Sequence, residues 1–362
     1  MGTEIFELMK KHNQEQIAFY TDKSTKLRAI LAIQSTALGP AIGGVRFYRY
    51  DSLDIAIYDL LRLSQGMTYK AAAGGINFGG GYLIVIEQEG MEKNEPLFRG
   101  IARFIQSFNG RFIAAEDIGV TDEHMEFMAL ETKHITGFPF SYSGITGHSM
   151  MCAYGTFIGI RAAAKFKWNS DNLSGKKIVI QGYGRVGARL AELTKNEGAE
   201  VVVTDINADR IKQAQKDGLS VIAPENVYSE PCHILSPCSI GTVINPENCE
   251  KFRCEVIAGS ANNQMDNDNT DLLLKKRGIL YAPDFIINSG AVINISEERL
   301  GGHYKKEEVI RKTEKIYDRL LEIFQNSEAN DISPNQAAAL YAQKRIDSIK
   351  ELKGVHTANS HS

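Results

Sequence analysis

Cysteine is scarce in this sequence, which limits the kinds of site it can form. The five cysteines are too few, and odd in number, for a secreted disulfide scaffold, and no two have the CxxC spacing of a zinc site. We therefore expect a reducing compartment, the cytoplasm. Cys232 and Cys238, which lie on either side of His233, are expected to be buried near strand ends rather than to bind a metal.

An excess of one charge and long apolar runs are also absent. Lys and Arg number 41 against 44 Asp and Glu, a formal net charge of −3, so the charge balance favours neither nucleic acid nor an anionic membrane as a partner. No run approaches the ~18 consecutive apolar residues of a membrane span. Residues 1–6 lack the basic region and apolar stretch of a signal peptide, so none is expected.

The sequence does contain the material for two globular cores. Its 362 residues favour two domains, and its hydrophobic fraction of 43% and charged fraction of 23% are ordinary for a globular protein. With this much apolar material, neither disulfides nor metals are needed to hold the fold.

The first third of the chain mixes helices and strands. Apolar residues at helical spacing predict a helix over 53–63, and the apolar run 83–86 is typical of a buried strand. A further helix is expected over 96–108, because a proline stands near its first turn. Two more strands are expected, over 27–33 and 111–114.

The remainder alternates strands with helices. Strands are expected at 177–181 and 201–204, helices at 154–166, 186–196 and 208–216, and short apolar runs follow at 219–222, 233–235, 256–258 and 279–281. Such alternation implies a doubly wound parallel sheet. Two more helices are expected, at 307–325 and 333–352.

The predicted fold class is therefore α/β with two domains. Residues 1–140 would form a mixed α/β domain, and residues 147–330 a Rossmann-type domain on a doubly wound parallel sheet. The stretch 137–147, rich in Gly, Pro and Ser, is expected to be a hinge. The polar tail 355–362 is expected to be disordered.

The sharpest local signal is the run Gly182-Tyr183-Gly184-Arg185-Val186-Gly187, which follows an apolar strand and opens a helix. In a dinucleotide-binding turn, such glycines allow a tight turn, close approach of a pyrophosphate and close helix–strand packing. The helix N-terminus offers free amides to phosphates. The alternative, an ordinary glycine turn, is disfavoured because strand, helix and a following acid are all in place.

That acid is Asp205, which ends the next expected strand. A carboxylate at this point accepts hydrogen bonds from the adenosine ribose and disfavours a 2′-phosphate, so NAD is favoured over NADP. Arg210 weakens this preference, because a nearby arginine can receive a 2′-phosphate.

Two glycine clusters flank a lysine in the first third. Gly66 precedes Lys70, and glycines 74–75 and 79–81 follow it. One interpretation is backbone packed tightly around a small ligand; the other is a solvated Lys70 in a glycine-rich turn.

An acid pair, Glu116 and Asp117, ends the strand expected near 111–114. The ends of strands are where α/β proteins place their sites. A helix-capping or structural role for Glu116 and an N-cap or turn role for Asp117 are the alternatives.

Many collinear blocks of the chain match one enzyme family. They are 36–46, 66–70, 115–119, 182–187, 236–238, 259–264, 281–284 and 288–294. Through these blocks, which span nearly the whole chain, the sequence resembles the glutamate/leucine/phenylalanine/valine dehydrogenases, most of all the leucine dehydrogenases among them.

The resemblance implies a domain order and an activity. Residues 1–140 would bind substrate and form the oligomer, a homodimer or octamer, with the helix at 333–354 packing back on them. The second domain would bind NAD. The implied reaction is the reversible oxidative deamination of an apolar L-amino acid to a 2-oxo acid.

The resemblance also implies roles for residues in the matching blocks. Lys70 would bind the substrate carboxylate, and Asp117 would handle the amino or imino proton. Asn262 and Asn263 lie in the block that holds the carboxylate and the nicotinamide ribose. The implied pocket for the substrate side chain comprises Met67, Ile42, Gly43, Ala115, Ala291 and Val292. The implied cofactor contacts beyond the glycine run and Asp205 are Cys152, Ile206, Cys238, Ser239, Ala261, Asn262 and Asn288.

One departure from the family pattern falls on the catalytic machinery. The family's glycine triplet is followed by a lysine that activates water against the iminium carbon, whereas here Tyr82 follows glycines 79–81. A lysine with a depressed pKa can do this near neutral pH. A tyrosine has a reference pKa of about 10 and carries no positive charge when protonated. We therefore expect altered chemistry, with Tyr82 and Asp117 as the catalytic residues.

A second departure lies just before Ala153, where 148–152 replaces the family's Pro-Ser-Pro-hydrophobe-Thr run. Cys152 replaces a hydroxyl. His148 is either a new titratable group in the cleft or, the simpler interpretation, a solvated hinge histidine.

Three functions remain open at this point. The first is an amino-acid dehydrogenase in which Tyr82 weakly replaces lysine. The second is an imine-reducing or coupling enzyme of a specialised biosynthetic pathway, and the third is a non-catalytic NAD-binding relative. Lys70, Asp117 and the glycine run argue against the third, because a purely structural protein has no need of them.

Overall fold

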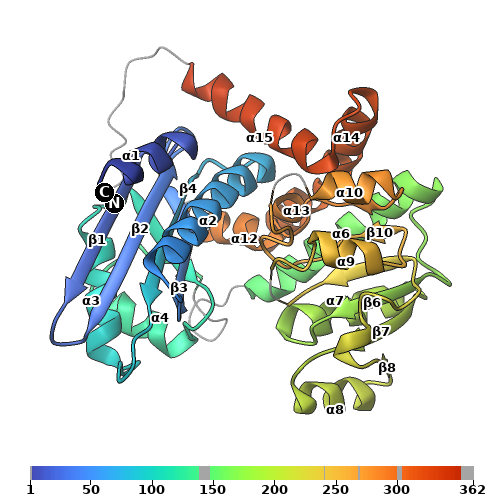
Figure 1. Cartoon of the computed structure of the whole chain (residues 1–362), viewed down its shortest axis with the longest axis horizontal. Helices are drawn as coiled ribbons and strands as arrows, with labels where there is room; N and C mark the ends of the chain where they lie inside the picture. The colour runs from blue at the N-terminus through green and yellow to red at the C-terminus, as the bar shows by residue number, and fades with distance from the viewer. Residues whose placement is uncertain (1, 138–146, 240, 268–269, 300–303, 352–362) are drawn as a thin grey trace.

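The computed structural model describes residues 2–137, 147–239, 241–267, 270–299 and 304–351. They form two lobes, each built on its own sheet, and the C-terminal helices lie above both (Figure 1).

The first lobe is built on a mixed sheet. Its strands are β1 (Gln16–Asp22), β2 (Leu27–Ser35), β3 (Ala41–Tyr48), β4 (Gly79–Ile86) and β5 (Phe112–Glu116), in the order β1-β2-β4-β3-β5. β2 is antiparallel to β1 and β4, whereas β3 is parallel to β4 and β5. This order places the end of β5 beside β3, although 63 residues lie between Tyr48 at the end of β3 and Phe112 at the start of β5.

Helices cover both faces of this sheet. They are α1 (Gly2–Lys11), α2 (Leu53–Gly74), α3 (Glu95–Gln106) and α4 (Asp122–Ala129). Successive side chains of a strand point to opposite faces, so Ile30 and Tyr82 pack with α2 while Leu31 and Leu83 pack with α3. The α2 face of the sheet is therefore the face that carries Tyr82.

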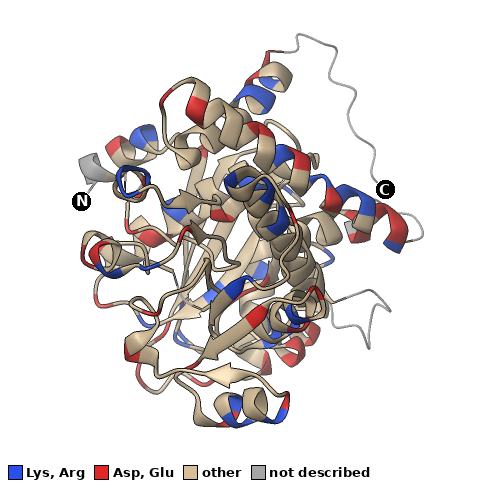
Figure 2. Ribbon diagram, turned by 90° about the vertical axis from the view of Figure 1, so that its right-hand side faces the viewer, with Lys and Arg blue, Asp and Glu red and all other residues tan. Residues whose placement is uncertain are grey.

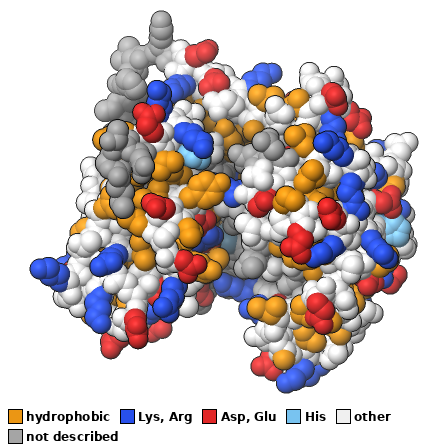
Figure 3. Space-filling view, viewed as in Figure 1, with side chains coloured by type: hydrophobic (Ala, Val, Ile, Leu, Met, Phe, Trp, Pro, Cys, Tyr) orange, Lys and Arg blue, Asp and Glu red, His pale blue; other side chains and the backbone are white. Residues whose placement is uncertain are grey.

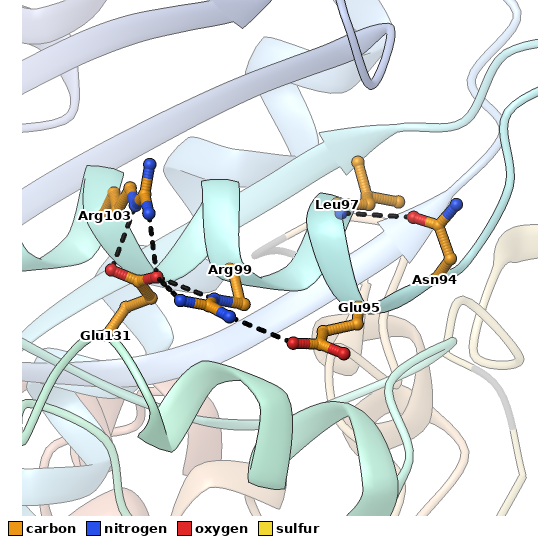
Figure 4. A network of polar contacts seen from close by, with 6 residues as sticks. All are labelled: Asn94, Glu95, Leu97, Arg99, Arg103 and Glu131. Atoms are coloured by element: carbon orange, nitrogen blue, oxygen red, sulfur yellow. Dashed lines mark hydrogen bonds and ion pairs between the residues drawn. The ribbon is translucent and has the colours of Figure 1, made fainter.

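Polar contacts fix the start of α3 and tie it to the segment after α4 (Figure 4). Asn94 is the N-cap, since its side chain accepts a hydrogen bond from the Leu97 amide at 3.2 Å. Glu131 accepts from Arg103 Nε at 3.0 Å and Arg99 Nε at 2.7 Å. Hydrogen bonds from these two arginines lower the pKa of Glu131 to about 2.

The second lobe is built on a parallel sheet. Its strands are β6 (Lys177–Gln181), β7 (Glu200–Thr204), β8 (Ser220–Val221), β9 (Ile234–Pro237), β10 (Val256–Ile257) and β11 (Leu280–Tyr281). Their order is β8-β7-β6-β9-β10-β11, with every pair parallel. This is the order of a dinucleotide-binding Rossmann sheet, whose direction of winding reverses between β6 and β9. The predicted doubly wound parallel sheet is confirmed.

Helices again cover both faces. They are α6 (His148–Trp168), α7 (Arg185–Asn196), α8 (Ala208–Lys216), α9 (Pro246–Lys251) and α10 (Asp271–Lys276). Two further helices, α11 (Asp284–Ile287) and α12 (Gly290–Arg299), pack against α2 and α6. Ile178 and Ile180 of β6 pack with Leu190 of α7, while Val179 faces the opposite side with Phe252. A fully apolar strand such as β6 is thus buried on both faces.

The last three helices join the lobes. They are α13 (Lys306–Glu314), α14 (Ile316–Ala329) and α15 (Pro334–Lys350). α15 packs against α2, where Arg345 Nη1 donates to the carbonyls of Ala72 at 3.1 Å and Ile76 at 2.7 Å, and Nη2 to Asn77 Oδ1 at 2.7 Å. Arg345 therefore ties α15 to the last turn of α2 and to the residues that follow it.

The structure moves two expected boundaries. The helix expected over 53–63 continues to Gly74, because its second half packs against β4 and α15. The helix expected over 307–325 is two helices separated at Lys315. Most of the expected hinge, 138–146, and the expected disordered tail, 355–362, lie outside the described residues.

Acidic and basic side chains are interspersed over both lobes (Figure 2). In the part of the chain that the structure describes, no helix combines the length and apolarity needed to cross a membrane.

Candidate active site

The surface is hollowed between the two lobes (Figure 3). A cavity of about 320 Å³ lies between α2, the 262–265 segment, the start of α11 and the start of α15. Of the residues singled out from the sequence, it is lined by Met67, Lys70, Tyr82, Asn262 and Asn263. The cavity thus brings residues from both lobes to one place.

Lys70 lies on α2 and is 8% exposed, so the solvated-turn interpretation is wrong. Its Nζ donates to Asn262 Oδ1 at 2.8 Å, and Asn288 Nδ2 donates to the same oxygen at 2.9 Å. Burial lowers the pKa of Lys70. Among the described residues no carboxylate lies within ion-pair distance, so this ammonium has donors left for an anionic ligand.

Two further groups face Lys70. Burial raises the pKa of the Cys152 thiol to about 12, although Lys70 acts in the opposite direction. Burial also raises the pKa of Asp284, although the hydrogen bond from the Gln264 amide and the charge of Lys70 lower it. The sequence analysis did not assign a role to Asp284. Its position in the matching block 281–284 was the only available signal.

Tyr82 and Asp117 are in contact. Tyr82 is 4% exposed on β4, and its hydroxyl donates a hydrogen bond to the carboxylate of Asp117, the residue that follows β5. Burial and the Asp117 charge raise the pKa of Tyr82 well above its usual value. The phenol is therefore neutral, and its proton is directed to Asp117.

Arg46 is a residue of this site that the sequence analysis missed. Its Nε donates to Asp117 Oδ2 at 2.7 Å, and its guanidinium lies 5.7 Å from the centre of the Tyr82 ring. Asp117 also begins a turn, since its carbonyl accepts from the Val120 amide at 3.1 Å, but its carboxylate is held by Arg46 and Tyr82. The run of 36–46 that ends in Arg46 matched the family, but sequence alone did not show that β3 lies beside β5.

The expected side-chain pocket forms an apolar cluster beside the cavity. Ile42, Ala115 and Val292 are buried in one cluster with the half-buried Met67. A Cβ at Gly43 would lie 1.8 Å from the Gly81 carbonyl oxygen, so this glycine is required for strand packing. Ala291 precedes Val292 on α12 and is half-buried. Only Met67 of this group lines the cavity described above.

The glycine run lies between β6 and α7, at the point where the strand order reverses. Gly182 has a φ of +101°, and a Cβ at Gly187 would lie 2.0 Å from the Gly182 carbonyl oxygen, so the turn itself requires both. A Cβ at Gly184 would meet nothing closer than Arg210 at 3.7 Å. The packing of the protein does not explain Gly184, whereas a pyrophosphate in this open space would.

The N-terminus of α7 is also available to bind a phosphate group. Its N-cap is Gly184, which makes no side-chain capping hydrogen bond. Val186 lies in the first turn. Arg185 is 71% exposed, and its Nη2 lies 3.6 Å from Glu116 Oε1 of the other lobe. Burial raises the pKa of Glu116, and Arg185 acts against this shift. Glu116 thus makes a contact between lobes rather than a cap.

Asp205 directly follows β7, beside the glycine run. Its Oδ2 accepts from the Tyr183 amide at 2.7 Å and its Oδ1 from the Asn207 amide at 2.8 Å. Burial opposes ionisation, but these amides and Arg210 lower the pKa of Asp205. The next side chain, Ile206, is 94% exposed.

The remaining predicted cofactor contacts surround this turn. Cys238 follows β9, and its backbone lies 3.1 Å from where a Gly182 Cβ would stand, as does the Ser239 Cβ. Ala261 is buried next to Asn262, and Asn288 Nδ2 donates to the Ser260 carbonyl at 3.1 Å. Asn262 accepts hydrogen bonds from both Lys70 and Asn288, so these two predicted contacts lie beside Lys70.

His148 begins α6 and is not a solvated histidine. Its side chain is 13% exposed, with Nδ1 3.2 Å from Asn294 Nδ2 and Nε2 3.5 Å from Glu298 Oε1. Burial lowers the pKa of His148, although Glu298 raises it.

Comparison with known proteins agrees with this geometry. The family model described as "Glu/Leu/Phe/Val dehydrogenase, dimerisation domain" matches residues 13–134. The model described as "Glutamate/Leucine/Phenylalanine/Valine dehydrogenase" matches residues 143–208 and 203–354.

Individual relatives match over nearly their whole length. Leucine dehydrogenase of Thermoactinomyces intermedius is 42% identical over 350 residues, which are 96% of this chain and 95% of the relative. Phenylalanine dehydrogenase of the same organism is 39% identical over 355 residues, 97% and 96% of the two chains. The crystal structure of L-tryptophan dehydrogenase from Nostoc punctiforme aligns with a TM-score of 0.80 at 34% identity, over 96% of this chain and 100% of that one. This chain therefore belongs to the Glu/Leu/Phe/Val dehydrogenase family of oxidoreductases.

Proposed function

We propose that this protein is an NAD-dependent oxidoreductase acting on the CH–NH2 or C=N group of an apolar or aromatic substrate derived from an amino acid, with its chemistry altered by Tyr82. One observation carries the proposal: Lys70 and Tyr82 line one cavity, and Tyr82 is hydrogen-bonded to Asp117. The relatives named for leucine, phenylalanine and tryptophan support the substrate class.

The second lobe fits NAD. The open space at Gly184, the uncapped start of α7 and the exposed Ile206 would accommodate a pyrophosphate and an adenosine. Asp205 would accept the ribose hydroxyls and disfavour a 2′-phosphate. A bound nicotinamide would take a hydride from, or return it to, the substrate carbon. The groups that would border it are Cys152, Cys238, Ser239, Ala261, Asn262 and Asn288.

Lys70 would bind the substrate carboxylate. It is a buried cation with one protein hydrogen bond, from Nζ to Asn262 Oδ1, and a carboxylate would supply the missing negative charge. Asn263, which lines the same cavity, would assist. The substrate side chain would lie against the apolar cluster around Ile42, Ala115 and Val292.

Asp117 would be the acid/base, and Tyr82 limits what it can do. Deamination needs water to attack an iminium carbon, a step that the neutral amine of a lysine with a depressed pKa assists as a general base. The Tyr82 hydroxyl is neutral and donates to Asp117, so Tyr82 does not supply such a base. Reduction of an imine that is already formed needs no activated water. This difference favours imine reduction over deamination.

The test is a spectrophotometric NADH assay of the wild type on L-leucine, L-phenylalanine and L-tryptophan, on their 2-oxo acids with ammonia, and on preformed imines of those oxo acids. We expect weak deamination, about 10²–10⁴-fold below lysine-bearing relatives, and much faster imine reduction. Deamination of leucine at the relatives' rate would contradict the altered chemistry. If the protein bound NAD but converted none of these substrates, the non-catalytic function would be the one that remains.

The cofactor part of the proposal has its own readout. Calorimetry with NAD and NADP should give tighter binding of NAD, and Gly184→Val should abolish binding by filling the space for the pyrophosphate. Because a side chain at Gly184 meets only Arg210, the variant should keep the wild-type melting temperature. Equal affinity for both cofactors would show that Asp205 does not reach the ribose.

A further inference from the structure

Behind Asp117, a row of part-buried polar side chains runs into the first lobe. Arg46 Nε donates to Asp117 Oδ2 at 2.7 Å, and Arg46 Nη1 donates to Asp59 Oδ2 at 3.1 Å. The Tyr50 hydroxyl donates to the same Asp59 oxygen at 2.7 Å. The side chains of Arg46, Asp117 and Asp59 are 14%, 16% and 26% exposed. The Arg46 guanidinium therefore binds two carboxylates in a poorly solvated part of the lobe.

Asp59 lies outside the cavity, on α2, and does not line it. Its effect on the site therefore passes through Arg46. We propose that Asp59 is a positioning residue that fixes Arg46 and, by sharing its charge, sets the pH at which Asp117 takes up a proton. This inference rests on the proposed role of Asp117 as acid/base and extends it to a residue that touches no substrate.

The physical argument is electrostatic. A cation close to a carboxylate favours its charged form, and a second carboxylate on the same cation weakens that effect. With Asp59 ionised, Asp117 is attracted to a partly neutralised guanidinium. With Asp59 made neutral, the full charge of Arg46 acts on Asp117, which then protonates at lower pH. The other charged or titratable groups that face Asp117 are Tyr82 on β4, Lys70 on α2, Glu116 on β5, and Tyr50.

The test compares pH profiles of kcat/KM for imine reduction. Asp59→Asn keeps an oxygen that can accept from Arg46 and removes only the charge, so the acid limb should move down by about one pH unit. Asp54→Asn is the matched control, because Asp54 is exposed in the first turn of the same helix; its profile should equal that of the wild type. An unmoved acid limb in folded Asp59→Asn would overturn the inference.

A second variant and a second measurement test the same inference independently. Tyr50→Phe removes a hydrogen bond that stabilises the Asp59 charge, so it should move the acid limb in the same direction by less; a shift upward would contradict the inference. Carbon-13 NMR titration of the aspartate carboxyls, with Asp117 assigned from Asp117→Asn, reads the same shift without turnover. If Asp117→Asn keeps full activity while the NMR shift is present, the acid/base proposal fails and the Asp59 effect stands.

Discussion

Tyr82 fits into the first lobe because the neighbouring strand lacks a side chain. A Cβ at Gly44 would lie 2.6 Å from the Tyr82 hydroxyl and 2.8 Å from Asp117 Cβ, distances that real side chains do not adopt. The hydroxyl therefore occupies the space that Gly44 leaves open, within reach of Asp117. At this scale the site is a phenol, a carboxylate and a guanidinium in contact, with Lys70 as the separate cation of the cavity.

Substitutions of Tyr82 test this arrangement. Tyr82→Lys should raise deamination of an aliphatic amino acid by about 10²–10⁴-fold, because it restores a group that can activate water. Tyr82→Phe keeps the ring and removes the hydroxyl, so it separates chemistry from space-filling. If the hydroxyl matters, Tyr82→Phe lowers the kcat of imine reduction; if the ring only fills space, kcat does not change. A Tyr82→Lys variant that binds NAD yet deaminates no faster would make His148 or another group the activator.

At the scale of elements, local rules predicted the second lobe well and the first lobe less well. The turn from β6 to α7 and the acid after β7 follow from short motifs, so strands, helix and glycine run were placed correctly. Lys70 was not placed on a helix, because the glycines around it suggest a turn and only packing against β4 and α15 shows otherwise. The Arg46–Asp117 pair depends on β3 lying beside β5, which no local pattern encodes. Nothing in the sequence marks the break at Lys315.

The start of α15 forms one wall of the cavity, opposite Leu63 and Met67 of α2. Ala339 is the small side chain of that wall, and the neighbouring Leu340 is 57% exposed and does not line the cavity. Ala339→Trp should therefore raise the KM of bulky substrates by at least about tenfold, a loss of ~1.4 kcal/mol, while NAD affinity is kept. Leu340→Trp is the control on the outer side of the helix. Equal KM values in the two variants would show that substrates do not enter between α2 and α15.

At the scale of the whole molecule, α15 joins the C-terminal part of the chain to α2 in the first lobe. The Arg345 guanidinium donates to the carbonyls of Ala72 and Ile76, two and six residues after Lys70, so the position of Lys70 depends on a helix that is remote in sequence. The cavity is likewise complete only when α2, the second lobe and α15 are together.

Removal of the Arg345 guanidinium should lower the stability of the fold. Arg345→Met should lower the free energy of unfolding by about 2–3 kcal/mol, because it leaves buried carbonyls without a charged donor. Lys344→Met is the matched control, since Lys344 is exposed on the same helix. Chemical denaturation of the two variants measures the difference. Equal unfolding midpoints would show that water replaces Arg345 at the end of α2.

The contact between Arg345 and Ile76 spans 269 residues, and this has a consequence for synthesis. At about 5–20 residues per second, roughly 15–55 s pass between the emergence of α2 from the ribosome and that of its partner helix. Throughout that interval the nascent first lobe exposes the face of α2 that α15 later covers. A chaperone that binds apolar surface has that time to act, until α15 emerges and covers this face of α2.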